Sequence, residues 1–319
     1  MTRRFLLTRL GGAILTLFGV AVLVFVVLRL IPGDEITGIL GIEAGNLTEA
    51  QLKALESYFG LNQPPHEQFF GWLFNVLGGN LGISMRSGAS VASLIGDALP
   101  VTMELAVLSL ALGILLGVPI GVYAATKQGK APDVAAQSFG LIGLAIPNFV
   151  VGTFLITLVA EWFSYFPNAA GYVPPWEDPW LNFQQMIFPA ISLGVVLAGS
   201  IMRTTRSAFL EVSAEPFVRT ARGKGLPPRR VKWVHVFRNA TIPIVTITGI
   251  QFGYLLGGTV VIEQIFALPG LGRLVFTAIN QREFAVVQST VLVIAAMFVI
   301  VNLLVDLLYA RIDPRIRLQ

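Results

Sequence analysis

Three acidic side chains are the first candidates for chemistry in this sequence, because each lies close to a long apolar stretch. They are Glu104, Glu263 and Asp306. An acidic group within a membrane is a candidate for ion or proton transfer by default, since burying its charge is costly. All three lie near the predicted ends of their stretches, where water is close, and no series of acids and His residues forms a proton relay. A transport role and simple hydration both stay open.

The residues that catalysis or metal binding would require are scarce. The chain has no Cys, and its two His residues are His66 and His235, which excludes disulfides, thiolate catalysis and most transition-metal sites. The sequence contains no HExxH pair, GxSxG turn or phosphate-binding GxxxxGK[ST] segment. We therefore predict no catalytic residue, no metal site and no cofactor in this chain.

Positive charge is concentrated in one segment, residues 203–238, which we call the basic loop. Glu211 and Glu215 are its two acids. Its nine basic residues are Arg203, Arg206, Arg219, Arg222, Lys224, Arg229, Arg230, Lys232 and Arg238. This composition fits two interpretations equally: a solvated loop beside anionic lipid, and a surface on which another molecule docks.

A short helix is predicted within the basic loop, at residues 217–226. Its apolar stripe consists of Phe217, Val218, Ala221 and Leu226. Each of its two glycines weakens an isolated helix by roughly 1 kcal/mol relative to Ala, so the helix needs a tertiary contact or a partner surface to form. The proline pair that begins at Pro227 then ends it.

Apolar stretches of membrane-spanning length dominate the rest of the chain. Of the 319 residues, 55% are hydrophobic and 13% are charged, against about 25% charged in an average soluble domain. A helix crosses the hydrocarbon core with about 20 apolar residues and satisfies its own backbone there, and the alternating pattern of barrel strands is absent. We predict an all-α polytopic membrane protein with six transmembrane helices, at residues 10–31, 99–124, 136–160, 188–208, 241–266 and 285–309.

The distribution of Lys and Arg predicts the orientation. With the N-terminus inside, 17 of the 22 basic residues lie on the cytoplasmic side, where such residues are favoured. Both termini and the basic loop are therefore expected in the cytoplasm. The chain then divides into an N-terminal transmembrane helix (1–32), which is too long for a signal peptide, an extracytoplasmic segment (33–98) and a five-helix core (99–319).

Small residues and prolines predict how the helices pack. Gly113, Gly117 and Gly121 repeat at every fourth position, the spacing that lets two helices approach closely. Pro119 and Pro147 are expected to kink the second and third helices. The second helix should therefore lie at short range from a neighbour.

The outer segments carry helix signals of their own. Thr48 and Gln51 have the spacing of a capping box at a helix start. The apolar piece 69–77 is too short to span a bilayer, so we expect it at the outer interface or packed over the bundle. Aromatic residues crowd loop 161–187, which predicts either a belt at the headgroup level or the lining of an external vestibule.

Two strings in the basic loop, VRTARGKGL and RNATIP, resemble the EAA loop of binding-protein-dependent ABC importer permeases of the peptide/nickel subfamily. Ala221 and Gly225 match the motif's second alanine and its glycine. Arg219 and Thr220 stand where the general motif has glutamate and alanine, and the gap from Gly225 to Pro243 is longer than in the general motif. Both departures are similar to the version found in the peptide permeases.

The resemblance covers nearly the whole chain. Further similar strings, in order, are RLIPGD (29–34), YFGLNQP (58–64), GNLGIS (79–84), VIE (261–263), LPGLG (268–272) and LYARIDPR (308–315). Glu35 stands where the family commonly has proline. Each string is weak alone, but their order and spacing together make the resemblance specific.

The resemblance implies a type I ABC importer (MetI-like) permease fold and a coupling (EAA) loop at about 209–240. That loop would contact a cytoplasmic ATPase through Phe217, Val218, Arg219, Thr220, Ala221, Arg222, Gly223, Lys224, Gly225 and Leu226. The implied partners are a second homologous permease, two ATPase subunits that bind ATP and Mg, an extracytoplasmic substrate-binding protein and the lipid bilayer of a bacterial or archaeal inner membrane. Nucleic acid is not among them.

The implied cargo is a di- or oligopeptide, with nickel chelates or glutathione as alternatives, and no residue indicates the substrate site. A second class of function is an ion-coupled secondary transporter or channel, which would leave the basic loop unexplained. A membrane scaffold without transport activity is also compatible with the residue chemistry, and copurification of ATPase subunits would distinguish it.

Overall fold

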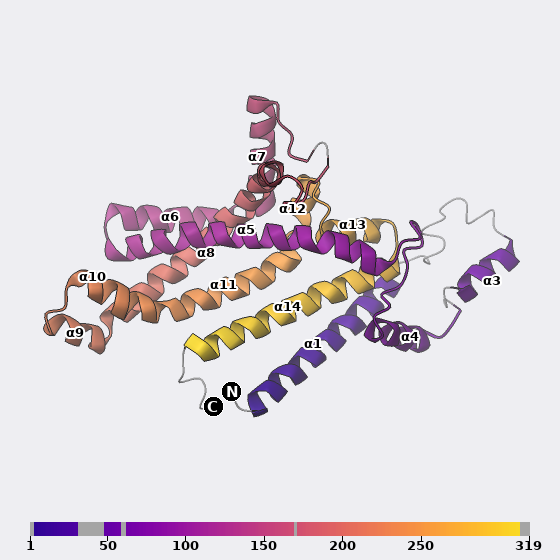
Figure 1. The fold of residues 1–319 in the computed structure, drawn as a ribbon, viewed down its shortest axis with the longest axis horizontal. Helices are drawn as coiled ribbons and strands as arrows, with labels where there is room; N and C mark the ends of the chain where they lie inside the picture. Colours follow the sequence, from indigo (N-terminus) through magenta and orange to yellow (C-terminus); the bar gives the residue numbers. More distant parts are fainter. Residues whose placement is uncertain (1–2, 31–47, 59–61, 169–170, 313–319) are drawn as a thin grey trace. The chain divides into compact units, whose positions relative to one another are not determined.

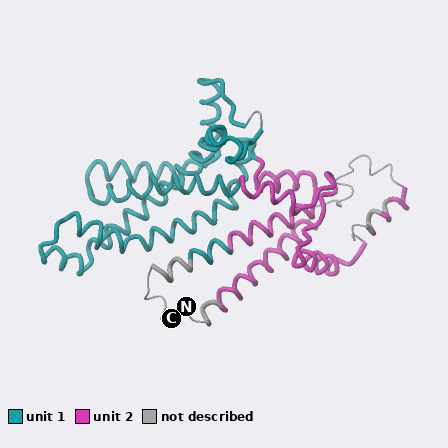
Figure 2. The backbone as a smooth tube through the Cα atoms, in the orientation of Figure 1, with its two compact units in different colours: residues 1, 102–268, 300–319 teal, residues 2–101, 269–299 magenta. Residues whose placement is uncertain are grey.

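The computed structural model describes residues 3–30, 48–58, 62–168 and 171–312, and the regular elements of these parts are helices (Figure 1). The chain forms two compact units (Figure 2). Two of the helices, α5 and α14, contribute residues to both units.

Unit 2 contains the N-terminal elements and a segment close to the C-terminus. Its elements are α1 (Arg3–Leu30), α3 (Glu49–Tyr58), α4 (Pro65–Leu77), the start of α5 (Val91–Thr126), α13 (Leu271–Asn280) and the start of α14 (Phe284–Ile312). Unit 1 contains the remainder of α5 and α14 and the elements between them. These are α6 (Ala131–Ala145), α7 (Asn148–Phe163), α8 (Pro179–Ala214), α9 (Pro216–Gly223), α10 (Pro228–Arg230), the π-helical η2 (Val231–Phe237), α11 (Arg238–Gly258) and α12 (Val260–Ile265).

Helices of membrane-spanning length account for most of the described chain. Among the described residues, five are long and apolar enough to cross a membrane: Leu7–Leu30, Val91–Thr126, Pro179–Ala214, Pro228–Gly258 and Phe284–Val305. A sixth crossing results if α6 and α7 count as one broken span. On that count the six predicted transmembrane helices are present, and the all-α polytopic class is confirmed.

The third predicted span, 136–160, is not one helix. α6 and α7 meet at an angle of 94°, so the kink predicted at Pro147 is a complete break. Ile146 has extended backbone angles, φ −88° and ψ 121°, because the ring of a proline disfavours the helical conformation in the residue before it. Pro119 has no such effect, since α5 runs through it as one helix.

The outer helices of unit 2 follow the sequence predictions. The backbone N–H of Thr48 donates to Oε1 of Gln51 at 2.9 Å, and the backbone N–H of Gln51 donates to Oγ1 of Thr48 at 3.3 Å, so the capping box is confirmed. The apolar piece predicted at 69–77 lies in α4, where the ring of Phe69 packs edge-on against Phe25 of α1 with centroids 5.1 Å apart. α4 therefore covers a membrane helix, as one of the two expectations proposed.

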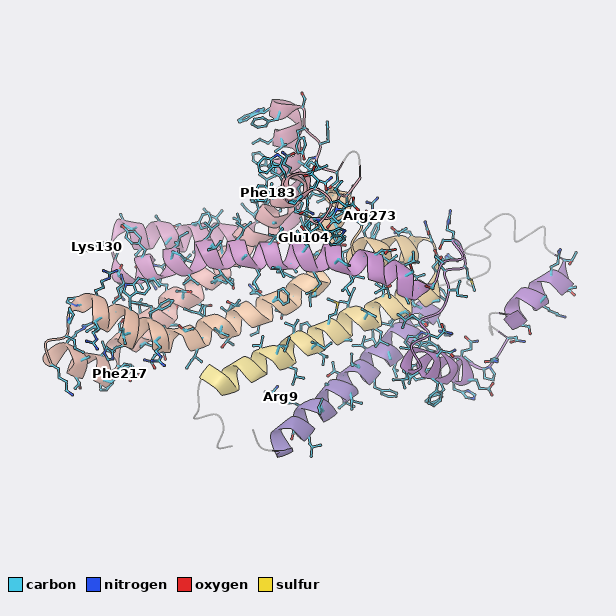
Figure 3. The ribbon with its side chains drawn as sticks, in the orientation of Figure 1. Arg9, Glu104, Lys130, Phe183, Phe217 and Arg273 are labelled. Atoms are coloured by element: carbon cyan, nitrogen blue, oxygen red, sulfur yellow. The ribbon has the colours of Figure 1, made fainter. Side chains whose placement is uncertain are left out.

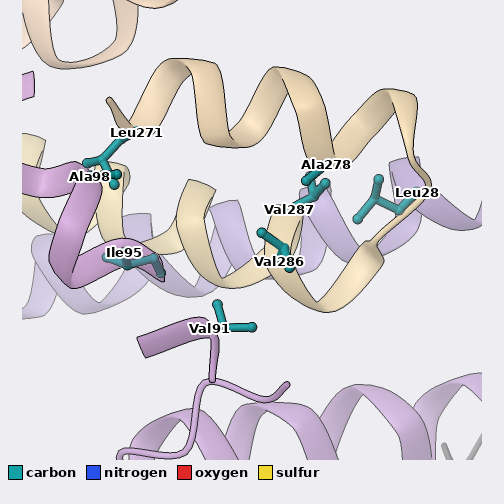
Figure 4. Packing of buried hydrophobic residues seen from close by; sticks show 8 residues of the cluster. All are labelled: Leu28, Val91, Ile95, Ala98, Leu271, Ala278, Val286 and Val287. Atoms are coloured by element: carbon teal, nitrogen blue, oxygen red, sulfur yellow. The ribbon is translucent and has the colours of Figure 1, made fainter. Parts of the chain in front are cut away.

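Apolar side chains from α1, α5, α13 and α14 form the core of unit 2 (Figure 4). The buried members are Leu28, Val91, Ile95, Ala98, Leu271, Ala278, Val286 and Val287. Fully burying a Val or Leu side chain contributes about 1.5 to 3 kcal/mol. This cluster is therefore a principal reason why segments so distant in sequence share one unit.

Small residues set the spacing between α5 and α8 in unit 1. A Cβ atom added to Gly117 would lie 2.8 Å from the carbonyl oxygen of Ala198, and one added to Gly121 would lie 2.6 Å from that of Met202. Atoms at such distances overlap, so these positions have room only for glycine. The close approach predicted from the glycine spacing is confirmed, and α8 is the neighbour.

We expect Gly121→Ala to lower the thermal unfolding midpoint of the purified protein in detergent, because overpacking of this kind costs about 1 to 3 kcal/mol. The matched control is Gly96→Ala on the same helix, where an added Cβ atom meets nothing within 4 Å. There Ala stabilises a helix by about 1 kcal/mol over Gly, so the midpoint should stay or rise. Equal shifts in the two variants would contradict the packing argument.

Candidate functional site

The short helix predicted in the basic loop is present as α9. It begins at Pro216 and ends at Gly223, three residues before the predicted end. The cause is Gly225, whose φ of +76° belongs to the left-handed region, so the chain leaves the helix there before the proline pair is reached. A glycine adopts this conformation with little strain.

One side of α9 is buried in the protein's own core. Val218 is 0% exposed and Ala221 is 6% exposed. They belong to a cluster that also contains Val122 and Ala125 of α5, Phe209 of α8, and Val231 and Val236 of η2. This cluster is the tertiary contact that the predicted helix needed, and it fixes α9 to the ends of α5 and α8.

The rest of the surface of α9, outside this buried stripe, is open and carries both of the helix's charges. Besides Pro216, the exposed side chains of α9 and its C-cap residue are Phe217, Arg219, Thr220, Arg222 and Lys224, and we call these five the α9 face. Phe217 was predicted in the apolar stripe but is 42% exposed, and it lies near one end of unit 1 (Figure 3). An exposed aromatic residue among cations is a suitable contact for a partner protein, because aromatic and Arg side chains are enriched at such interfaces.

The two residues that match the EAA motif do not lie on the α9 face. Ala221 is small because it packs in the cluster with α5, α8 and η2. A Cβ atom added to Gly225 would have open space around it, with nothing within 4 Å. The position therefore requires glycine for its backbone conformation and not for its small size. Ala221 thus anchors α9, and Gly225 shapes the turn that follows it.

An ion pair that the sequence did not indicate fixes α6 to α8. Asp133 is 1% exposed and receives two hydrogen bonds from the guanidinium of Arg206, of which Nη2 to Oδ2 measures 2.8 Å. The backbone N–H of Gly129 adds a third at 2.9 Å. One of the nine cations of the basic loop is therefore already paired. An acid in the first turn of a helix, where the helix dipole favours it, was the only signal in the sequence.

Glu263 lies in a different environment from the one predicted. It is 0% exposed, and the hydroxyl groups of Thr102 and Thr259 each donate a hydrogen bond to it at 2.8 Å. The expectation that water lies close to it is wrong, because α12, the helix that carries Glu263, packs against α7 and α8. The side chain of Asp306 lies outside the described part of the structure.

Glu104 is half-buried and accepts a hydrogen bond from the hydroxyl of Tyr172 at 2.6 Å. Burial, and then this contact with the carboxylate, raise the pKa of Tyr172 above its ordinary value. The side chain of Gln185 on α8 holds the same loop by donating to the carbonyl oxygen of Gly171 at 2.7 Å. Trp176 in this loop is exposed, and both predictions for the aromatic residues, a headgroup belt and a vestibule lining, stay predictions.

Two family models match this chain. The model described as "Binding-protein-dependent transport system inner membrane component" matches residues 117–318, and the model of the N-terminal part of the same membrane component matches residues 1–106. The chain belongs to this family. This binding-protein-dependent permease is thus a membrane subunit of an ABC importer and is not itself an enzyme.

Curated relatives match the permease over almost its full length. A probable peptide ABC transporter permease protein, y4tP of Sinorhizobium fredii, is 39% identical over 315 residues, which is 98% of this chain and 99% of the relative. The glutathione transport system permease protein GsiC of Salmonella typhi is 39% identical over 314 residues, 98% of each chain. A putative peptide transport system permease protein of Brucella melitensis is 39% identical over 317 residues, 99% of each chain.

Solved structures of ABC transporters share the fold of the permease. An amino acid ABC transporter described "with histidines" gives a TM-score of 0.54 at 17% identity, over 69% of this chain and 94% of that one. The inward-facing MetNI methionine ABC transporter gives a TM-score of 0.54 at 15% identity, over 70% of this chain and 97% of that one. The predicted MetI-like permease fold is confirmed, while the domain limits predicted at 32 and 98 stay predictions.

Proposed function

We propose that α9 is the coupling helix of this permease and that the α9 face docks in a groove on a cytoplasmic ATPase subunit. The observation that carries the proposal is the two-sidedness of α9: Val218 and Ala221 anchor one side in a shared core, and Phe217, Arg219 and Arg222 are open on the other. A short helix held in this way transmits a push or pull on its open side to α5 and α8. Helix-in-groove docking is a recurring mode of recognition.

Within this proposal the ten residues predicted for coupling divide into three groups. Those that touch the ATPase are Phe217, Arg219, Thr220, Arg222 and Lys224. Those that anchor the helix to the permease are Val218, Ala221 and Leu226, which is partly buried in the same cluster. Gly223 and Gly225 end the helix. Nucleotide binding then shifts the permease between inward-open and outward-open states through contacts that differ between the states.

The proposed assembly has this permease, a second homologous permease, two ATPase subunits that bind ATP and Mg, and an extracytoplasmic substrate-binding protein. It lies in the inner membrane with both termini and the basic loop in the cytoplasm, as the excess of Lys and Arg favours.

The proposed cargo is a short peptide or a related solute such as glutathione. The support for this cargo comes from relatives at 39% identity that are named as peptide and glutathione permeases, and a nickel chelate is the alternative.

Reconstitution of the chain in lipid vesicles tests the proposal. Uptake of solute is expected when the second permease, both ATPase subunits, the binding protein and ATP are present, and it should stop when the ATPases are omitted. The purified chain alone, under a proton or sodium gradient, should not transport. Gradient-driven uptake by the chain alone would overturn the proposal in favour of a secondary transporter.

A further inference from the structure

α8 carries a polar face that the coupling helix does not use. Its residues recur every three or four positions, which places them on one side of a helix. They are Ser200, Arg203, Thr204, Ser207 and Glu211, and with Ala208 of α8, Leu144 of α6 and Pro243 of α11 they line a cavity of about 420 Å³. We call these five side chains the α8 polar face. The other side of α8 packs against the glycines of α5.

The two charged side chains of this face have no charged partner among the residues that the structure describes. Arg203 and Glu211 are both exposed, and neither forms a hydrogen bond or an ion pair with another described side chain. Arg206 differs, because it is paired with Asp133. Charged side chains of membrane helices face the interior of a bundle or a water-filled cavity instead of lipid. Arg203 lies at the cytoplasmic end of the predicted span 188–208 and Glu211 just beyond it, so the α8 polar face meets water or a polar solute.

We infer that the α8 polar face lines the solute pathway next to the basic loop and binds a zwitterionic solute, with Arg203 on its carboxylate and Glu211 on its ammonium group. The two residues are eight positions apart, about 12 Å along a helix. An extended peptide covers about 3.3 to 3.6 Å per residue, so the two ends of a peptide of three or four residues reach both charges. The cavity volume lies within the range of about 300 to 1,000 Å³ that is usual for small-ligand sites.

This inference rests on the proposed transport function for the identity of its ligand, but its geometry can be tested without transport. The chain has no Cys, so a single introduced thiol is the only one in it. Ser200→Cys and Ser207→Cys place a thiol on the polar face. Ser192→Cys places one on the same helix at a position that is 0% exposed, and it is the matched control.

The first measurement is the rate at which each thiol reacts with the anionic sulfonatoethyl methanethiosulfonate, in the importer assembled in lipid nanodiscs and without ATP. Ser200→Cys and Ser207→Cys are expected to react at least tenfold faster than Ser192→Cys. Rates equal to the control would overturn the inference, since the face would then be covered. Reaction with an apolar maleimide alone would also overturn it, since the face would then meet lipid.

The second measurement tests the charge of the site. Ser200 lies three positions from Arg203, and a unit charge at such a distance in water changes the local concentration of an ion roughly threefold. Arg203→Gln should therefore slow the anionic reagent at Ser200→Cys about threefold and speed up the cationic trimethylammonioethyl reagent. Lys127→Gln, an exposed cation away from the cavity, should change neither rate. Identical rates in the two backgrounds would remove Arg203 from the site.

The third measurement tests the ligand. Millimolar trialanine should slow labelling of Ser200→Cys, and its C-terminal amide, which lacks the carboxylate, should not. Equal protection by both, or protection by neither, would overturn the zwitterion assignment. None of these rates depends on ATP hydrolysis, so a failure of the pathway inference is distinct from a failure of α9 to couple.

Discussion

Replacing Arg219 and Arg222 together by Glu is expected to abolish most of the ATPase stimulation that substrate and binding protein produce in the assembled importer. Both side chains are exposed on the α9 face, so the reversal leaves the buried side of α9 unchanged. Charge pairs that are desolvated at an interface cost about 2 to 5 kcal/mol when one partner is lost. Losing even part of that energy is expected to lower the stimulated ATPase activity by about tenfold or more. Stimulated and basal phosphate release, measured on the same preparation, give the result.

The control for this experiment is Lys127→Glu with Lys130→Glu. These two cations are also exposed, lie in the turn between α5 and α6, and change the charge by the same amount in the same predicted compartment. Stimulation should stay close to that of the unmodified importer, and both double variants should keep its thermal midpoint. If the control lost stimulation to the same degree, a general field of positive charge would explain coupling, and α9 would have no special part in it.

Features that depend on neighbours in sequence were predictable. The capping box of Thr48 and Gln51 needs two residues three positions apart, and the α5 glycines needed only their spacing of four. The start of α9 was predictable for the same reason, because an apolar stripe is a local signal. Apolar stretches likewise located the spans, since the requirement for about 20 apolar residues is a property of the stretch itself.

Features that depend on distant contacts were not predictable. Asp133 and Arg206 are 73 positions apart, and their sequence contexts indicate an ordinary first-turn acid and one more cation of a basic loop. Glu263 was expected near water because it lies near the end of an apolar stretch. In the structure it is buried, because the helix that carries it, α12, packs against α7 and α8. Whether such groups are buried depends on which helices pack against each other, and a single sequence does not show which helices do so.

The α9 segment combines both kinds of feature. Its motif residues were identified from the sequence, but their physical roles required the fold. Ala221 could have been small so that a partner helix or groove approaches it closely, and the sequence alone does not distinguish this from packing inside the permease. The cluster with Val122 and Phe209 assigns it to the permease. Ala221 of the motif therefore belongs to the packing that holds α9, the helix for which we propose a coupling role.

Gly225 gives the sharpest test of that distinction. If its role is the backbone conformation, with φ at +76°, Gly225→Asn should retain most of the substrate-stimulated ATPase activity, because Asn tolerates the left-handed region better than other residues. Gly225→Ala should lose more, since the strain for an ordinary residue there is roughly 1 to 2 kcal/mol. That strain shifts the population of the native turn by a factor of roughly 5 to 30. Gly225→Val should lose the most, since a β-branched residue is a clear outlier at positive φ.

A steric role predicts the reverse order for two of these variants. If Gly225 is small so that an ATPase surface can approach, Ala, the smaller side chain, should be tolerated better than Asn. The ranking of Asn against Ala in stimulated ATPase activity therefore decides between the two roles without any need for the absolute size of the effect. Membrane insertion and copurification of the ATPase subunits, measured for each variant, separate a failure to couple from a failure to assemble. We expect Asn to rank above Ala, because the position has open space around an added Cβ atom and only the backbone angle restricts it.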